Sequence, residues 1–297
     1  MSRHAYLIMV HHRPDLLREL LSAIDDYRND IYIHIDCKSN VTDWDLETHA
    51  SRVVCVEPMS VNWAGYTQIE CTYKLLSAAY EQGPYEYYHF VTGVTFPLKS
   101  QDEIHSFFDQ NQGTEFIGFD DKNDFSFRAK YFFAFSEMGK PSDFISKVKW
   151  KIRELLIKMQ SAVKFNRLIF DKELRSWVIK KGMAYVSITH DFVGYVLQSR
   201  GKIQKLLKHS ISGDEIFIQT LAYNSPYRAK LYSLENEFLG CSREFAWDDV
   251  MGEREGHNYI WDDLEFLLRS DKCFALKFEG KDGMRLIHEI KEKKNIK

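Results

Sequence analysis

Apolar residues in the first third of the chain alternate between short unbroken runs and helix-spaced stripes. Residues 5–10 form one unbroken apolar run, and residues 31–35 form a second run of strand length. Between them, apolar residues recur at helical spacing after Pro14-Asp15, a pair that favours the start of a helix. This order predicts a strand–helix–strand unit whose strands run parallel with a right-handed crossover.

The same kind of pattern continues along the rest of the chain. It predicts further strands at residues 53–56, 87–91, 114–119 and 184–188, and helices at residues 67–80, 145–163, 191–198, 214–223 and 283–294. Alternating strands and helices are typical of an α/β fold with a mostly parallel sheet flanked by helices. The sequence has neither an internal repeat nor a low-complexity linker. We therefore expect a single domain over residues 1–297, with a helical insertion at about 140–180.

The composition is that of a globular protein that does not bind nucleic acid. Hydrophobic residues make up 44% and charged residues 28% of the 297 residues, and the formal net charge is −3. The charge is uneven, because residues 141–181 hold 11 Lys+Arg against four Asp+Glu, whereas the remainder holds 29 against 39. This basic segment fits either a solvated helix face or a surface that attracts anionic lipid or a phosphate-bearing acceptor.

The five cysteines indicate a reducing compartment. Cys37, Cys55, Cys71, Cys241 and Cys273 are odd in number and widely spaced, and no two of them form a Cys-x-x-Cys pair. This pattern argues against a disulfide framework and against a zinc site. No apolar stretch is long enough to span a bilayer, so we expect a cytoplasmic protein.

Polar residues follow several of the predicted strands directly. A histidine pair at residues 11–12, Asp36 and residues 93–99 lie at the carboxyl ends of strands, where ligands of parallel sheets bind. The motifs of dinucleotide, P-loop and zinc-protease sites are missing from the sequence. The pair Asp43 and Asp45 either lies in a surface turn or binds a nucleotide diphosphate through a divalent metal ion.

Three residues of the last third are candidates for chemistry. Glu215 either closes a capping box with Ser212 or presents a carboxylate that takes a proton from a hydroxyl. Arg243 and Lys277 are the two candidate cations. In the run Phe-Ala-Leu-Lys-Phe at 274–278, alternation places Lys277 opposite the apolar side chains, so it is either an edge residue or an anion ligand.

Seven segments, in order along the chain, resemble the core-2/I-branching β-1,6-N-acetylglucosaminyltransferase family. This is glycosyltransferase family 14, which includes the peptide O-xylosyltransferases. The segments are A-Y-L-I-M-V-H (5–11), Y-I-H-I-D-C-K (32–38), V-N-W-A-G (61–65), V-T-G-V-T-F-P-L-K (91–99), S-G-D-E (212–215), Y-N-S-P-Y (223–227) and F-A-L-K-F (274–278). The resemblance implies a GT-A-type, Rossmann-like fold and an inverting transfer from a UDP-sugar. It also implies that no metal is needed, because basic side chains take its place at the diphosphate.

The resemblance assigns a UDP site to residues of this chain. It implies that Asp36 contacts the uracil, near Met9 and Val10 at the end of the first strand. It also implies that Arg243 and Lys277 bind the diphosphate. Preformed positive partners of this kind stabilise the charge that develops on a leaving diphosphate.

For the transfer step, the resemblance points to Glu215 as the base that deprotonates the acceptor hydroxyl. Trp63, Thr95, Tyr185 and Asp214 fall in motifs on the side of the acceptor and the donor sugar. Thr95 stands where the family has an aspartate, which leaves the identity of the acceptor open.

The sequence thus predicts a bacterial-type, metal-independent, inverting transferase that moves a sugar, GlcNAc by preference, from UDP to a hydroxyl of a glycan or lipid-linked glycan. We expect it to act in surface polysaccharide synthesis, and we expect neither a cofactor nor a nucleic-acid partner. A peripheral contact of residues 141–181 with the inner membrane face stays an open alternative. Two alternatives are a UDP-xylose or UDP-galactose donor and a non-catalytic nucleotide-sugar-binding protein. A third is a metal-dependent enzyme that uses Asp43 and Asp45, or Asp120 and Asp121.

Overall fold

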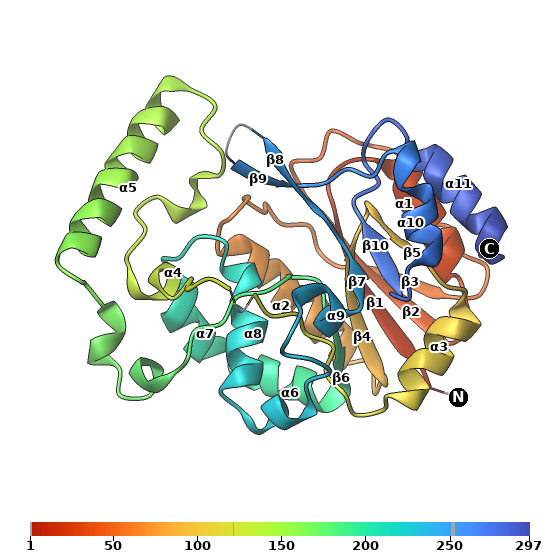
Figure 1. Ribbon diagram of the computed structural model, residues 1–297, viewed down its shortest axis with the longest axis horizontal. Helices are drawn as coiled ribbons and strands as arrows, with labels where there is room; N and C mark the ends of the chain where they lie inside the picture. Colours follow the sequence, from red (N-terminus) through yellow and green to blue (C-terminus); the bar gives the residue numbers. More distant parts are fainter. Residues whose placement is uncertain (1, 121, 251–252) are drawn as a thin grey trace.

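The computed structural model describes residues 2–120, 122–250 and 253–297. Within these residues, a five-stranded sheet with the order β3-β2-β1-β4-β6 forms the centre of the molecule (Figure 1). Strands β1 to β4 are parallel, and β6 runs antiparallel to β4. The strands are β1 (His4–Val10), β2 (Asn29–Ile35), β3 (Arg52–Cys55), β4 (Tyr87–Thr92) and β6 (Ser187–Thr189). This sheet confirms the predicted Rossmann-like α/β fold with a mostly parallel sheet.

Helices cover both faces of the central sheet. Side chains of β1 alternate between two apolar clusters, as expected for a strand that is buried on both sides. Tyr6 and Ile8 lie in the cluster that includes residues of α1 and α3, whereas Ala5 and Leu7 lie in the cluster of α2, α6, α7 and α8. These helices are α1 (Pro14–Ile24), α2 (Thr67–Tyr80), α3 (Gln101–Gln110), α6 (His190–Gln198), α7 (Arg200–Leu207) and α8 (Phe217–Tyr223).

A second sheet with the order β5-β10-β7 joins the last third of the chain to the central sheet. Thr95 of β5 pairs with Leu276 of β10, so Lys277 leaves its strand close to the turn that follows β4. The remaining elements on this side are β5 (Thr95–Pro97), β7 (Arg243–Glu244), β8 (Trp247–Val250), β9 (Glu253–Gly256), β10 (Phe274–Leu276), α9 (Glu237–Cys241), α10 (Leu264–Arg269) and α11 (Gly283–Lys294).

The predicted helical insertion contains α5 (Phe144–Ala162), which stands at the edge of the molecule opposite α11 in Figure 1. Leu168 and Leu174, which follow α5, pack in the same apolar cluster as α2. None of the described helices combines the length and the hydrophobicity needed to cross a lipid bilayer. The short helix α4 (Phe127–Lys130) precedes α5, and 3-10 turns occur at Ser136–Met138, Arg167–Phe170, Leu174–Ser176, Gly213–Glu215, Pro226–Lys230 and Trp261–Asp263.

Most of the predicted elements are present, and α2 and α11 have the predicted ends, but the strand predicted at residues 114–119 is wrong. In the described chain this segment changes partner every few residues: Glu115 bridges Leu231, Phe116 bridges Ser187 and Asp120 bridges Lys181. A ladder needs consecutive pairs with one neighbour, so isolated bridges form instead. The strand predicted at 184–188 begins at residue 187, and a 3-10 turn precedes the helix predicted at 214–223.

Candidate active site

Asp36 lies at the carboxyl edge of the central sheet, as the sequence predicted. Its N–H donates to the Val10 carbonyl at 2.9 Å, which extends the pairing of β1 and β2 by one bond. Its carboxylate accepts from the N–H groups of Lys38 at 2.8 Å and Val61 at 3.2 Å. Met9 is half-buried, and Val10 is buried and packs against the backbone of Gly93. Both residues therefore line this edge of the central sheet.

Basic side chains gather around one carboxylate beyond β10. Lys277 Nζ lies 3.1 Å from Glu279 Oε1, and His12 Nε2 lies 2.9 Å from Glu279 Oε2. Arg13 donates to the Glu279 carbonyl at 2.6 Å. Burial alone would raise the pKa of Glu279, but hydrogen bonds with His12 and Lys277 outweigh it and hold the pKa below its usual range. The sequence indicated Lys277 and the histidine pair, but it did not indicate that Arg13 and Glu279 would join them.

Glu215 is held between two cations at the surface. Arg128 Nη1 lies 2.8 Å and Lys181 Nζ 3.8 Å from Glu215 Oε2, and 26% of the glutamate side chain is exposed. The alternative of a capping box is wrong: among the described residues no backbone N–H donates to the side chain of Ser212, whose backbone is left-handed with φ 46°. The sequence did not single out Arg128 or Lys181, because their contacts with Glu215 are made only in the folded chain.

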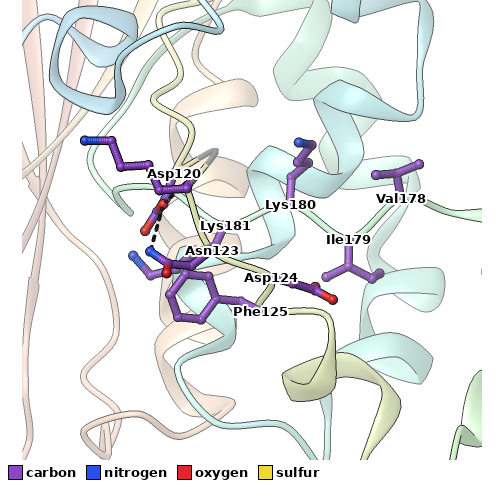
Figure 2. Close-up of a pocket in the computed structure, with 9 residues that line it drawn as sticks. Asp120, Asn123, Asp124, Phe125, Val178, Ile179, Lys180 and Lys181 are labelled. Carbon is purple, nitrogen blue, oxygen red and sulfur yellow. Dashed lines mark hydrogen bonds between the residues drawn. The ribbon is translucent and has the colours of Figure 1, made fainter.

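A cavity of about 300 Å³ borders Lys181 (Figure 2). Asp120 and residues 122–125 form one wall and residues 178–181 form the other, with Phe125 and Lys181 facing the same space. The ammonium group of Lys181 also lies 5.1 Å from the ring centre of Phe125 and 6.0 Å from that of Trp247. Lys181 therefore belongs both to the wall of this cavity and to the ion pairs of Glu215.

Tyr185 lies between the two charged groups. It packs with Met183 and Leu276, the residue before Lys277. Burial, and then the negative charges of Asp214, Glu215 and Glu279, raise its pKa. Burial, and then the charge of Glu215, also raise the pKa of Asp214. Tyr185 is therefore close enough to the Glu215 side and to the Glu279 side for both charges to act on its hydroxyl.

The turn that carries Trp63 is joined to the Glu215 turn. The Ala64 carbonyl accepts from the N–H of Ser212 at 2.8 Å, and Trp63 is 55% exposed beneath the ammonium of Lys140. The Trp63 turn therefore adjoins the turn that leads to Glu215. Thr95, which the resemblance places on the side of the acceptor and the donor sugar, is buried, and its hydroxyl accepts from the N–H of Thr92 at 3.1 Å.

Arg243 lies in the core, which overturns its predicted role at the diphosphate. Its side chain is fully buried. Its guanidinium donates to the carbonyls of Cys241 at 2.6 Å and Val186 at 3.1 Å and to Ser187 Oγ at 3.0 Å, and it lies over the ring of Phe274. These donors are directed to protein groups inside the fold, so the guanidinium is not presented to a ligand.

Of the acidic residues considered for a metal, Asp43 and Asp45 follow β2, Asp120 lines the cavity beside Lys181, and Asp121 lies outside the described residues. Asp43 is exposed, and Asp45 forms an ion pair with Arg18 at 2.8 Å. The Asp120 carboxylate accepts from the N–H of Lys122, and Asp121 lies outside the described residues. The described residues include no group of three or more His, Cys, Asp or Glu side chains arranged to hold a metal ion.

Comparisons with known proteins identify the family of this chain. The profile of the Core-2/I-Branching enzyme family matches residues 4–262. The human N-acetyllactosaminide beta-1,6-N-acetylglucosaminyl-transferase is 25% identical over 292 residues, or 93% of this chain and 68% of that protein, and the mouse protein of that name is 23% identical over 295 residues with the same coverage. A crystal structure of S. aureus TarS, residues 1–349, aligns over 37% of this chain and 33% of that chain at 15% identity, with a TM-score of 0.26, a similarity too low to inform on function. The chain therefore belongs to the Core-2/I-Branching enzyme family and is a glycosyltransferase.

Proposed function

We propose that this protein transfers GlcNAc from UDP-GlcNAc to a hydroxyl of a glycan, with inversion and without a metal. The observation that carries the proposal is the carboxylate of Glu215, which is partly exposed and held by Arg128 and Lys181 beside a cavity. The names of the human and mouse relatives support GlcNAc as the sugar.

In the proposed reaction Glu215 takes the proton of the acceptor hydroxyl while the hydroxyl oxygen attacks the anomeric carbon. The new carbon–oxygen bond forms as the bond to the diphosphate breaks, so a single in-line displacement inverts the configuration and needs one base. Among the described residues both cations contact Oε2 of Glu215, and we assign Oε1 to the acceptor. Asp214, whose pKa is raised by burial and by Glu215, retains a proton more readily and adds less competing negative charge.

The leaving UDP is stabilised by the basic group around Glu279. Lys277 and His12 contact the Glu279 carboxylate in the unliganded protein, and a bound diphosphate would offer them the same kind of partner. Preformed cations that face the diphosphate stabilise its developing negative charge, as a divalent ion does in metal-dependent transferases. This arrangement supports a mechanism without metal.

The acceptor is assigned to the cavity next to Glu215. Phe125 offers an aromatic face to a sugar ring, and Trp63 lies on the adjoining turn. All five cysteines are free thiols, which supports a reducing compartment. We infer that the acceptor is a glycan or lipid-linked glycan used to build a bacterial surface polysaccharide.

Substitution Glu215→Gln tests the proposal most directly. The amide keeps the shape of the side chain but cannot take a proton, so kcat should fall by about a hundred- to ten-thousandfold. UDP affinity, measured by isothermal titration calorimetry, should be unchanged because Glu215 does not face the diphosphate. The matched control is Glu57→Gln, which changes a carboxylate that is 86% exposed and paired with Lys74 on the surface.

Transfer is measured as UDP release from UDP-GlcNAc, UDP-xylose and UDP-galactose, each with and without EDTA, using a β-galactoside glycan as acceptor. The proposal expects UDP-GlcNAc to react fastest and EDTA to have no effect. Full turnover by Glu215→Gln would remove this residue from the mechanism. Donor binding without UDP release by the wild-type protein would show a non-catalytic binder.

A further inference from the structure

Helix α5 exposes a continuous apolar stripe. Seven large apolar side chains on α5 and at its C-cap are exposed, from 40% at Val148 to 81% at Phe144. They are Phe144, Ile145, Val148, Ile152, Leu155, Met159 and Val163. Because an α-helix turns by about 100° per residue and rises about 1.5 Å, all seven lie within an arc of about 100° along about 28 Å.

The other face of α5 attaches the helix to the protein through polar contacts. Arg153 is buried on this face. Gln160 accepts from the N–H of Phe132 at 2.7 Å and donates to its carbonyl at 2.8 Å. The helix stands at the outer edge of the molecule in Figure 1. Its orientation is therefore set by contacts that turn the apolar stripe to the outside.

Exposed lysines border the stripe. Lys147, Lys151 and Lys158 are spaced at i, i+4 and i+11, which places them within an arc of about 40° next to one edge of the stripe. The surrounding segment 141–181 holds 11 Lys+Arg against four Asp+Glu. An apolar stripe with a lysine border on a surface helix is the pattern of helices that lie in a lipid–water interface.

We propose that this outward face of α5 docks the protein on an anionic lipid bilayer, with the helix axis parallel to the membrane surface. The stripe would enter the boundary between headgroups and acyl chains while the lysines remain level with the lipid phosphates. Contiguous apolar patches are rare on monomeric proteins unless they are interaction sites. A second copy docked through the same face would bring two rows of lysines together, whereas anionic lipid complements them.

The docking face is linked to the candidate base by a short chain of contacts. Glu137, in the 3-10 turn before α5, accepts hydrogen bonds from the N–H groups of Tyr66 and Thr67. These residues follow the Trp63 turn, whose Ala64 carbonyl accepts from Ser212 three residues before Glu215. A membrane bound by α5 would therefore lie near the acceptor side of the site. The docking itself rests on α5 alone and does not require the proposed reaction.

Vesicle co-sedimentation tests the proposal with three forms of the protein. The wild-type protein should bind vesicles of phosphatidylglycerol and phosphatidylcholine far better than vesicles of phosphatidylcholine alone. Each lysine near an anionic surface favours binding about fivefold, so Lys147→Glu, Lys151→Glu and Lys158→Glu together should lower partitioning by about a hundredfold or more. Leu155→Ser with Met159→Ser should weaken binding to the same vesicles by about a hundredfold, because two exposed apolar side chains no longer enter the interface.

The matched control is Phe266→Ser with Arg269→Glu on α10, where the side chains are also exposed but lie across the molecule from α5. This control variant should bind the vesicles like the wild-type protein. Circular dichroism and UDP affinity should be unchanged in every variant, which separates loss of docking from loss of the proposed catalytic function.

Three results would overturn the docking proposal. The first is absence of wild-type binding to anionic vesicles. The second is equal binding by the α5 variants and the wild-type protein. The third is a dimer, seen by light scattering without vesicle binding, that Leu155→Ser with Met159→Ser dissociates; this would assign the stripe to a second copy of the chain.

Discussion

Substitution Arg243→Met distinguishes a core role of this arginine from a role at the diphosphate. Methionine has a similar length and fits an apolar environment, but it cannot donate hydrogen bonds. The change removes a guanidinium that donates to the Cys241 and Val186 carbonyls and to Ser187 Oγ at 2.6, 3.1 and 3.0 Å. It therefore removes this donor from these three buried acceptors and from the Phe90 carbonyl, which accepts at 3.3 Å.

The expected loss follows from these contacts. A buried acceptor left without a donor costs about 1–3 kcal/mol, whereas one that keeps another partner loses about 0.5–1.5 kcal/mol. The Val186 carbonyl keeps the N–H of Phe90 and Ser187 Oγ keeps its contact with His89 Nδ1, so the three together cost roughly 2–6 kcal/mol. Part of this cost is recovered because a charged group no longer has to be buried, as shown by the lowering of the Arg243 pKa through burial. We expect a net loss of about 3 kcal/mol in the free energy of unfolding, which for a chain of this length lowers Tm by about 5 °C.

Urea unfolding followed by circular dichroism measures the stability, and calorimetric titration with UDP measures the affinity of the folded protein. The core role predicts lower stability with unchanged UDP affinity. The matched variant Lys277→Ala should show the reverse, because Lys277 is partly exposed and pairs with Glu279 at the edge of the site. An Arg243→Met protein that keeps its stability and loses at least about tenfold in UDP affinity would refute the assignment of Arg243 to the core.

Two further predictions concern single charged groups. Lys277→Ala should weaken UDP by about ten- to a hundredfold, as expected for one charge-assisted phosphate contact, and leave uridine affinity unchanged in calorimetric titrations; an equal loss for both ligands would indicate a structural role. Glu115 is buried and accepts from the N–H of Thr189, and burial raises its pKa from 4.5 to about 7. The folded protein therefore holds this proton more tightly than the unfolded chain, and the free energy of unfolding should fall by about 3 kcal/mol as pH rises from about 4.5 through about 7. Glu115→Gln should lack this part of the pH dependence in urea unfolding, and identical pH profiles for variant and wild-type protein would contradict the buried, proton-binding carboxylate.

Elements whose partners are their own neighbours in sequence were well predicted. The ends of α2 and α11 match the prediction because helix periodicity and breaking residues act over a few positions. Residues 114–119 have strand-like composition, but whether they form a ladder depends on partners 70 to 120 residues away. The tertiary structure gives them a different partner every few residues, and pairing stays at isolated bridges.

In the candidate site, too, the features set by local sequence were predicted and those set by distant residues were not. Asp36 lies at the strand end where the order of strands predicted it. Lys277 is partly exposed whereas Phe274 and Leu276 are buried, as alternation predicted. The environment of Glu215 was open, because a capping box and a free carboxylate have the same local sequence. Arg128, from the distant short helix α4, decides between them by pairing with the carboxylate.

By itself, the sequence determined the α/β class, the parallel order of the first strands and the uneven charge of the insertion, and it singled out Glu215 and Lys277 as candidates for the base and a diphosphate cation. These features depend on local periodicity and on the order of motifs, which do not require knowledge of distant contacts. Only the tertiary structure decided that Arg243 is buried in the core, that Arg128 and Lys181 hold Glu215, and that the apolar stripe of α5 faces outward. The physical reason is that burial and ion pairing depend on which distant residues surround a side chain, and an arginine or a leucine stripe looks the same in sequence whether protein or solvent covers it.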